Sequence, residues 1–93
     1  MTKVTLYTEY FPELPALLDS LFEGYTLLRG EGRYKGVSES SAMVILYVEL
    51  DVDAHALAQR AAECIIRELN QESVWVEIAL VPVYRFNRRE RNQ

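Results

Sequence analysis

Apolar and polar residues alternate in three stretches of the chain, and this period of two is typical of β-strands with one buried face. Residues 3–9, KVTLYTE, show it first. Residues 41–50, SAMVILYVEL, give the strongest strand prediction because they are dense in β-branched and aromatic side chains. Residues 73–86 form the last predicted strand, in which Pro82 indicates an edge position or a bulge.

Two other stretches place their apolar residues at the helical spacing of three and four. In residues 11–24 the two prolines suit the first turn, where a missing amide proton costs little, and Gly24 suits the C-terminal cap. Residues 51–71 give the strongest helix prediction, with Asp53 as the N-cap. The predicted inner stripes are Leu14, Leu17, Leu18, Leu21 and Phe22 in the first helix, and Leu57, Ala61, Cys64, Ile65 and Leu69 in the second.

The remaining segments complete the order of elements. Residues 25–36 predict a second strand that degenerates into glycine-punctuated structure, and residues 37–41 predict a polar connector. The order β-α-β-β-α-β is typical of the ferredoxin-like α+β sandwich, in which two helices cover one face of a four-stranded antiparallel sheet. We expect one domain over residues 1–84, followed by a basic, flexible tail over residues 85–93.

The face of the sheet that the helices leave open is the informative one. An antiparallel strand with one solvated face should be polar on that side, but here the alternation leaves mostly apolar residues there. A patch of this kind usually marks an interface, so we expect a homo-oligomer that forms through the open sheet. A heterologous partner is the alternative. The expected interface residues are Tyr7, Met43, Ile45, Tyr47, Trp75 and Val81.

The net charge of −4 is unevenly spread over the 93 residues. Residues 85–93 carry four arginines and one glutamate, a net +3, which leaves six basic and thirteen acidic side chains, a net −7, for residues 1–84. An acidic body does not favour nucleic-acid binding, because neutralising phosphates needs a basic face. The arginine-rich tail could contact an anionic partner or an acidic neighbouring subunit.

The composition also limits location and metal chemistry. No apolar run approaches the roughly 18 residues of a membrane span, and the charged, alternating N-terminus is unlike a signal peptide. We therefore expect a cytoplasmic protein that does not contact a membrane. Cys64 is the only cysteine and His55 the only histidine, so we expect no intramolecular disulfide, no transition-metal site and no cofactor.

A glycine-rich basic stretch, residues 27–36, LLRGEGRYKG, is the candidate ligand site. It does not match a dinucleotide fingerprint, because a strand and not a helix follows the glycines, and it has no phosphate-binding GxxxxGK motif. Glycines also serve bulges and hairpin ends, so a purely structural hairpin is one interpretation. The other is an anion site formed by exposed amides and basic side chains. Its residues would be Arg29, Gly30, Gly32, Arg33, Tyr34 and Lys35.

The segment RGEGRYKG, followed by a β-rich run, resembles the segment that introduces the long signalling loop of the PII regulatory proteins, which are ferredoxin-like trimers. The resemblance extends loosely over the element order of nearly the whole chain. It implies an oligomeric regulatory protein with a ligand between subunits. Two features depart from the PII pattern: the long loop is reduced to VSESS, and LNQES replaces the glycine-rich segment that helps PII proteins hold ATP.

A second resemblance is locally closer. Gly32 with Tyr34, and the later run Gln71, Glu72, Ser73 and Val74, are similar to the pattern of an uncharacterised family of small bacterial ferredoxin-like domains. That resemblance implies the fold and no particular activity.

Three functional hypotheses follow. The first is a nonenzymatic oligomeric binding or regulatory domain that holds a small anionic, nucleotide-like ligand at subunit clefts. The second is a small acidic protein-binding inhibitor or adaptor, of the kind that phages use against host factors or to sequester signalling molecules. The third is a cofactor-free enzyme in which Glu9, Glu49 and Glu77, all on predicted strands, act as acid and base. The alternative is that these carboxylates are charges at the rim of an interface and have no catalytic role.

Overall fold

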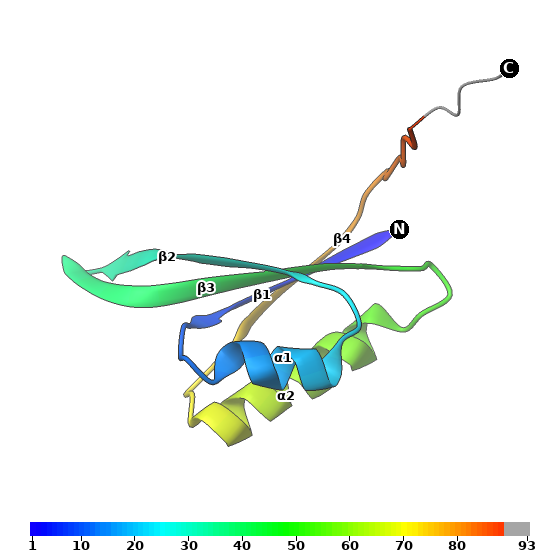
Figure 1. The fold of residues 1–93 in the computed structure, drawn as a ribbon. Helices are drawn as coiled ribbons and strands as arrows, with labels where there is room; N and C mark the ends of the chain where they lie inside the picture. Colours follow the sequence, from blue (N-terminus) through cyan, green and yellow to red (C-terminus); the bar gives the residue numbers. More distant parts are fainter. Residues whose placement is uncertain (89–93) are drawn as a thin grey trace, which may run out of the picture.

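Two helices lie side by side on one face of a four-stranded antiparallel sheet (Figure 1). The computed structural model describes residues 1–88, and the strand order is β2-β3-β1-β4. The ferredoxin-like α+β fold expected from the sequence is therefore confirmed. The elements are β1 (Thr2–Glu9), α1 (Leu14–Leu21), β2 (Thr26–Tyr34), β3 (Val37–Val48), α2 (Ala54–Leu69) and β4 (Trp75–Leu80).

The core lies between the sheet and the two helices. Alternate residues of the two central strands, β1 and β3, point toward the helices and are almost completely buried, as at Leu6 and Val44. Helix α1 contributes Leu14 and Leu18, and α2 contributes Ile65 among four buried alanines. Each buried Leu, Ile or Val side chain contributes about 1.5–3 kcal/mol to folding relative to an exposed one.

The two helices end differently from each other. Asp53 caps α2 as predicted, since its Oδ1 accepts a hydrogen bond of 3.0 Å from the Ala56 amide. Asn70 ends α2 in the left-handed conformation, with φ 53°. Helix α1 has Pro15 in its first turn, but its C-cap is the extended residue Phe22. The prediction that Gly24 caps this helix is therefore wrong: Phe22 N–H already bonds the Leu18 carbonyl oxygen.

Strands β2 and β3 form one long hairpin, which corrects two sequence expectations. Residues 25–36 do not degenerate, since β2 stays paired up to Tyr34, and residues 37–41 belong to β3. The turn consists of Lys35 and Gly36, with φ 50° and 79°, and positive φ at both central residues is the signature of a type I′ hairpin. Because β1 ends at Glu9, opposite Ser41, the last four β2–β3 pairs extend beyond the rest of the sheet (Figure 1). We call residues 31–40 the ribbon.

Strand β4 lies at the edge of the sheet and pairs only with β1. Of the two alternatives that Pro82 indicated, an edge position or a bulge, the edge position is confirmed, but the strand ends at Leu80 and not at residue 86. After a last hydrogen bond of 3.0 Å from the Val81 amide to the Met1 carbonyl oxygen, Pro82 has no N–H to continue a ladder. Residues 81–88 have no regular secondary structure, and the rest of the predicted tail, residues 89–93, lies outside the described residues.

Within residues 1–88, no helix is both long and apolar enough to cross a membrane.

The hairpin makes a prediction about its glycines. Gly36 has a positive φ that an L-residue adopts at a cost of about 1–2 kcal/mol, whereas Gly30 lies in the strand with open space around its α-carbon. Gly36→Ala should lower the free energy of unfolding by that amount, and Gly30→Ala, the matched control, should leave it unchanged or raise it. Urea denaturation of the two variants measures both values. Equal effects at the two positions would contradict the assigned turn.

Candidate functional site

The open face of the sheet carries a connected apolar surface. The register places Tyr7 beside both Met43 and Trp75, with Ile45 in the next row. Trp75 is 76% exposed and Tyr47 48% exposed. The predicted interface residues on β1, β3 and β4 therefore do share one face, and Val81 lies just after β4, half-buried.

Leu28 is an apolar residue of this face that the sequence did not reveal. It pairs with Met43 and is 48% exposed. If β2 is a regular strand, Leu28 lies on the opposite side from Leu27 and Arg29. This alternation could have identified Leu28 as a residue of the open face, but the glycines obscured the strand in the sequence. We define the open face by its apolar members: Tyr7, Leu28, Met43, Ile45, Tyr47 and Trp75.

The three candidate catalytic carboxylates do not come together. Glu77 lies opposite Thr5 in the middle of the sheet, and Glu9 lies four residues further along β1, about 13 Å away at 3.3 Å per residue. Glu49 is not on a strand, since β3 ends at Val48, next to the other end of β1. In the described part of the chain, no three His, Cys, Asp or Glu residues are grouped as a metal site would require.

Glu77 instead takes part in a hydrogen bond on the open face. The Tyr7 hydroxyl donates to Glu77 Oε1 over 2.9 Å. This bond to a carboxylate, together with the negative charge of Glu77, raises the pKa of Tyr7 above its usual value of 10.0. The pair links β1 to the edge strand β4 across the face.

The glycine-rich stretch divides between the two sides of β2. Arg29 pairs with the buried Ala42 and so lies on the helix side, as does Arg33 four pairs further along. Gly30, Gly32 and Tyr34 alternate with them and lie on the open side. The six predicted ligand residues therefore do not converge on one point of the hairpin.

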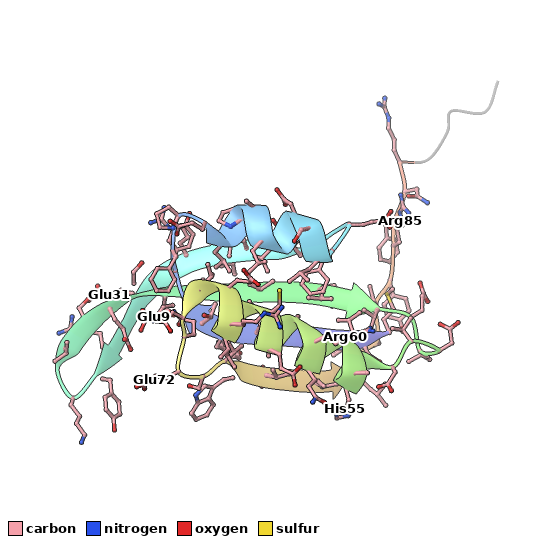
Figure 2. The ribbon with its side chains drawn as sticks, turned by 90° about the horizontal axis from the view of Figure 1, so that it is seen from below. Glu9, Glu31, His55, Arg60, Glu72 and Arg85 are labelled. Atoms are coloured by element: carbon pink, nitrogen blue, oxygen red, sulfur yellow. The ribbon has the colours of Figure 1, made fainter. Side chains whose placement is uncertain are left out.

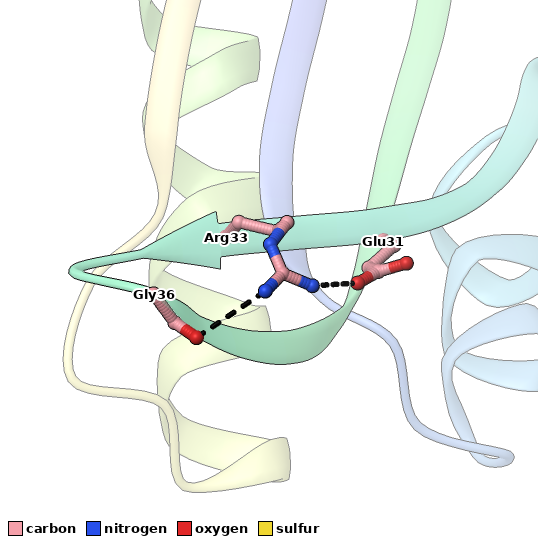
Figure 3. A network of polar contacts seen from close by, with 3 residues as sticks. All are labelled: Glu31, Arg33 and Gly36. Carbon is pink, nitrogen blue, oxygen red and sulfur yellow. Dashed lines mark hydrogen bonds and ion pairs between the residues drawn. The ribbon is translucent and has the colours of Figure 1, made fainter.

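The basic side chains of this stretch already have neighbours within the chain. The Arg29 guanidinium lies 3.8 Å from the centre of the Tyr10 ring, a cation–π contact. Arg33 forms an ion pair with Glu31 and donates to the Gly36 carbonyl oxygen over 3.3 Å (Figure 3). Hydrogen bonds from Ser38 and Arg33 lower the pKa of Glu31. Because this ion pair is exposed, it contributes little to stability and leaves Arg33 able to change partners.

A cavity of about 460 Å³ lies where β1 ends, at the base of the ribbon. Its walls come from the end of β1, residues 39–41 of β3, the connection 70–73 after α2, and the start of β4. The twelve lining residues include three carboxylates and three aromatic rings but no lysine, arginine or histidine. We call it the acidic cavity; its charged and aromatic residues are Glu9, Glu39, Glu72, Tyr7, Phe11 and Trp75.

A side-chain hydrogen bond joins the connection after α2 to β1 at this cavity. The buried Thr8 hydroxyl donates to Gln71 Oε1 over 3.4 Å. Gln71, Glu72 and Ser73, which the sequence singled out through a family resemblance, all line the cavity. The sequence offered no signal for Phe11 or Glu39, because only the fold brings these segments together.

Comparison with known proteins supports the fold. No family model and no curated protein matches the chain, so the second resemblance seen in the sequence stays a prediction. A nitrogen regulatory PII-like protein from Thiomonas intermedia K12, solved with ADP, AMP and bicarbonate, is 21% identical over 92% of this chain and 94% of its own, with a TM-score of 0.58. A putative PII-like signalling protein from Thermus thermophilus is 17% identical over 84% of each chain, with a TM-score of 0.48.

A third structure, a phage SAM lyase in the apo state, is 16% identical over 84% of this chain and 78% of its own, with a TM-score of 0.51. The protein thus has a ferredoxin-like fold similar to that of PII-like proteins, as the sequence resemblance implied.

The Tyr7–Glu77 bond predicts a pH effect. A tyrosine with a pKa raised in the folded state holds its proton where the unfolded chain has lost it, so this contribution is present below pH 10 and is lost as the pH rises further. Tyr7→Phe should therefore show a smaller fall in Tm between pH 9 and 11 than the native protein, both measured by circular dichroism. Tyr25→Phe is a second test, because the Asp19 hydrogen bond also raises the pKa of Tyr25 and its removal should reduce the fall in Tm in the same way. Identical curves for Tyr7→Phe and the native protein would contradict the role of this bond.

Proposed function

We propose that this protein is a nonenzymatic, homo-oligomeric binding or regulatory domain. Its subunits pack through the open face and hold a small anionic, nucleotide-like ligand in the cleft that forms between them. The observation that carries the proposal is the position of Tyr7 and Trp75, which belong both to the open face and to the wall of the acidic cavity. A second subunit covering the face would therefore also close the cavity.

The open face supports assembly on physical grounds. Large exposed apolar side chains on one contiguous surface lose contact with water only if another molecule covers them, and such surfaces are uncommon on monomers. Tyr47 and Trp75 are also the residue types that contribute most at protein interfaces. Glu77 is a carboxylate near the middle of this face, and a second subunit would remove it from water. The hydrogen bond from the Tyr7 hydroxyl lowers the cost of that burial.

An anionic ligand needs positively charged groups from outside the cavity wall. Three carboxylates and no basic side chain line the cavity within one chain, so a single chain would repel an anion. The ribbon lies next to it and carries Arg33 and the exposed Lys35. We propose that these two cations supply the attraction. The ADP, AMP and bicarbonate in the Thiomonas protein are anions of the proposed class.

An adaptor is the second candidate function, and the ribbon tip favours it. Tyr34 and Val37 pair at the end of the ribbon and are 68% and 66% exposed. An exposed apolar pair on a projecting hairpin suits contact with another protein. A stable monomer would favour this function over the first.

The oligomer makes the first prediction. Tyr47→Lys puts a positive charge on the open face directly opposite Lys3 and should reduce the sedimenting mass to that of one chain, because burying two like charges without a partner is costly. Leu50→Lys is the matched control: Leu50 is 68% exposed, lies outside the sheet, and should keep the native mass. Sedimentation velocity compares the two variants. A native oligomer that survives Tyr47→Lys would place the interface elsewhere.

The ligand makes the second prediction. ADP should raise the Tm of the native protein, since a ligand that binds only the folded state stabilises it. The double variant Arg33→Ala/Lys35→Ala should lose this rise and keep the native oligomeric mass. Arg60→Ala, on the outer side of α2, serves as the control that removes a cation elsewhere. If the rise persists in the double variant, the glycine-rich stretch is only a hairpin.

A further inference from the structure

The acidic cavity has no residue of opposite charge in its wall. Glu9 comes from β1, Glu39 from β3 and Glu72 from the connection before β4, so three separate segments bring carboxylates to one hollow. Phe11 and Trp75 add flat apolar surface beside them. Carboxylates next to aromatic rings suit an occupant that has both guanidinium groups and rings, because arginine pairs with carboxylates and stacks on aromatic faces.

The segment that follows β4 has this composition. Residues 84–88, YRFNR, contain two aromatic rings and two arginines, all exposed. Tyr84 is 78% exposed and Phe86 is 92% exposed, the highest value among the large apolar residues. Two exposed rings that are separated by one residue, in a segment without regular secondary structure, are expected to find a partner surface. We call residues 84–88 the C-terminal segment.

The path of the chain separates this segment from its own cavity. Strand β4 begins at the cavity with Trp75 and ends at Leu80, about 17 Å away at 3.3 Å per residue. The segment continues beyond Leu80 and projects from the body (Figure 1). Glu9 and Glu72 consequently lie at one end of the molecule and Arg85 at the other (Figure 2).

From this arrangement we propose that the C-terminal segment of one copy docks in the acidic cavity of a second copy. Arg85 and Arg88 pair with the carboxylates of Glu9, Glu39 and Glu72, and Tyr84 or Phe86 stacks against Trp75. Each copy gives one segment and receives one, so head-to-tail contacts of this kind can close a ring. The inference deepens the proposed function and rests on it in one respect, since it requires a second copy beside the cavity.

Docking would change the electrostatics of the proposed ligand site. Two arginines added to three carboxylates bring the cavity close to neutrality, so an anion would meet less repulsion in the assembly than in a free chain. The pairing involves groups near the surface, so salt should weaken it. Ligand affinity would then depend on assembly and on ionic strength together.

The test uses Trp75, the only tryptophan, as a probe inside the cavity. In the native protein at low salt its emission should be shifted to the blue relative to Arg85→Glu/Arg88→Glu, and ~0.5 M NaCl should remove the difference. The matched control is Arg60→Glu/Arg67→Glu, which makes the same charge change on the exposed side of α2 and should keep the native emission. Identical emission in the native protein and in Arg85→Glu/Arg88→Glu would overturn the proposal.

Mixing two variants tests whether docking occurs between copies. Glu39→Arg/Glu72→Arg has a basic cavity and a basic segment, and Arg85→Glu/Arg88→Glu has an acidic cavity and an acidic segment, so neither should dock with itself. On mixing, the acidic segment should enter the basic cavity and shift Trp75 emission to the blue. No shift on mixing, or a native shift that persists on dilution to single chains, would overturn docking between copies.

The same mixture separates the two proposals. If Tyr47→Lys keeps the native sedimenting mass while the mixture still shows the blue shift, the open-face oligomer fails and segment docking stands. If sedimentation shows the open-face oligomer but the mixture shows no shift, segment docking fails and the oligomer stands.

Discussion

Everything in this molecule depends on the burial of one face of the sheet by two helices, which leaves the other face without a cover. Val4 and Leu6 of the central strand β1 are completely buried against the helices. Because side chains alternate along a strand, Thr5 and Tyr7 must then point to the other side. Residues 1–88 supply no third layer for that side. The packing that stabilises the fold therefore leaves the open face uncovered, and the proposed interface is the simplest reason for its apolar residues.

The strands and helices with a buried face could be predicted from the sequence. In β1, β3 and α2, burial imposes a period of two or of 3.6 on the apolar residues, and this period can be read without a structure. The hairpin could not be predicted in the same way. Residues 31–40 extend beyond the two-layer body and have no buried side, so serines and glycines are as suitable there as valines. Backbone hydrogen bonds to the opposite strand hold this segment in the β conformation. Because they involve no side chains, they impose no pattern of apolar residues on the sequence.

The candidate site shows the same division. Once β2 is a regular strand, alternation alone puts Arg29 and Arg33 on one side and Gly30 and Gly32 on the other, so the glycine-rich stretch cannot form a compact cradle. The acidic cavity joins segments that lie far apart in the chain, and no local spacing could indicate it. The basic charge of the C-terminal segment is visible in the sequence, but the cavity that matches it and the exposure of Tyr84 and Phe86 need the structure.

The central claim is that a small molecule is held between subunits that meet at the open face. Native mass spectrometry of the protein, purified gently from cells, tests it most directly, because one spectrum reports the number of chains and any bound mass. The account predicts a defined oligomer that carries extra mass and loses it when the chains separate. A single chain without added mass would contradict it and direct the search to a protein partner of the open face.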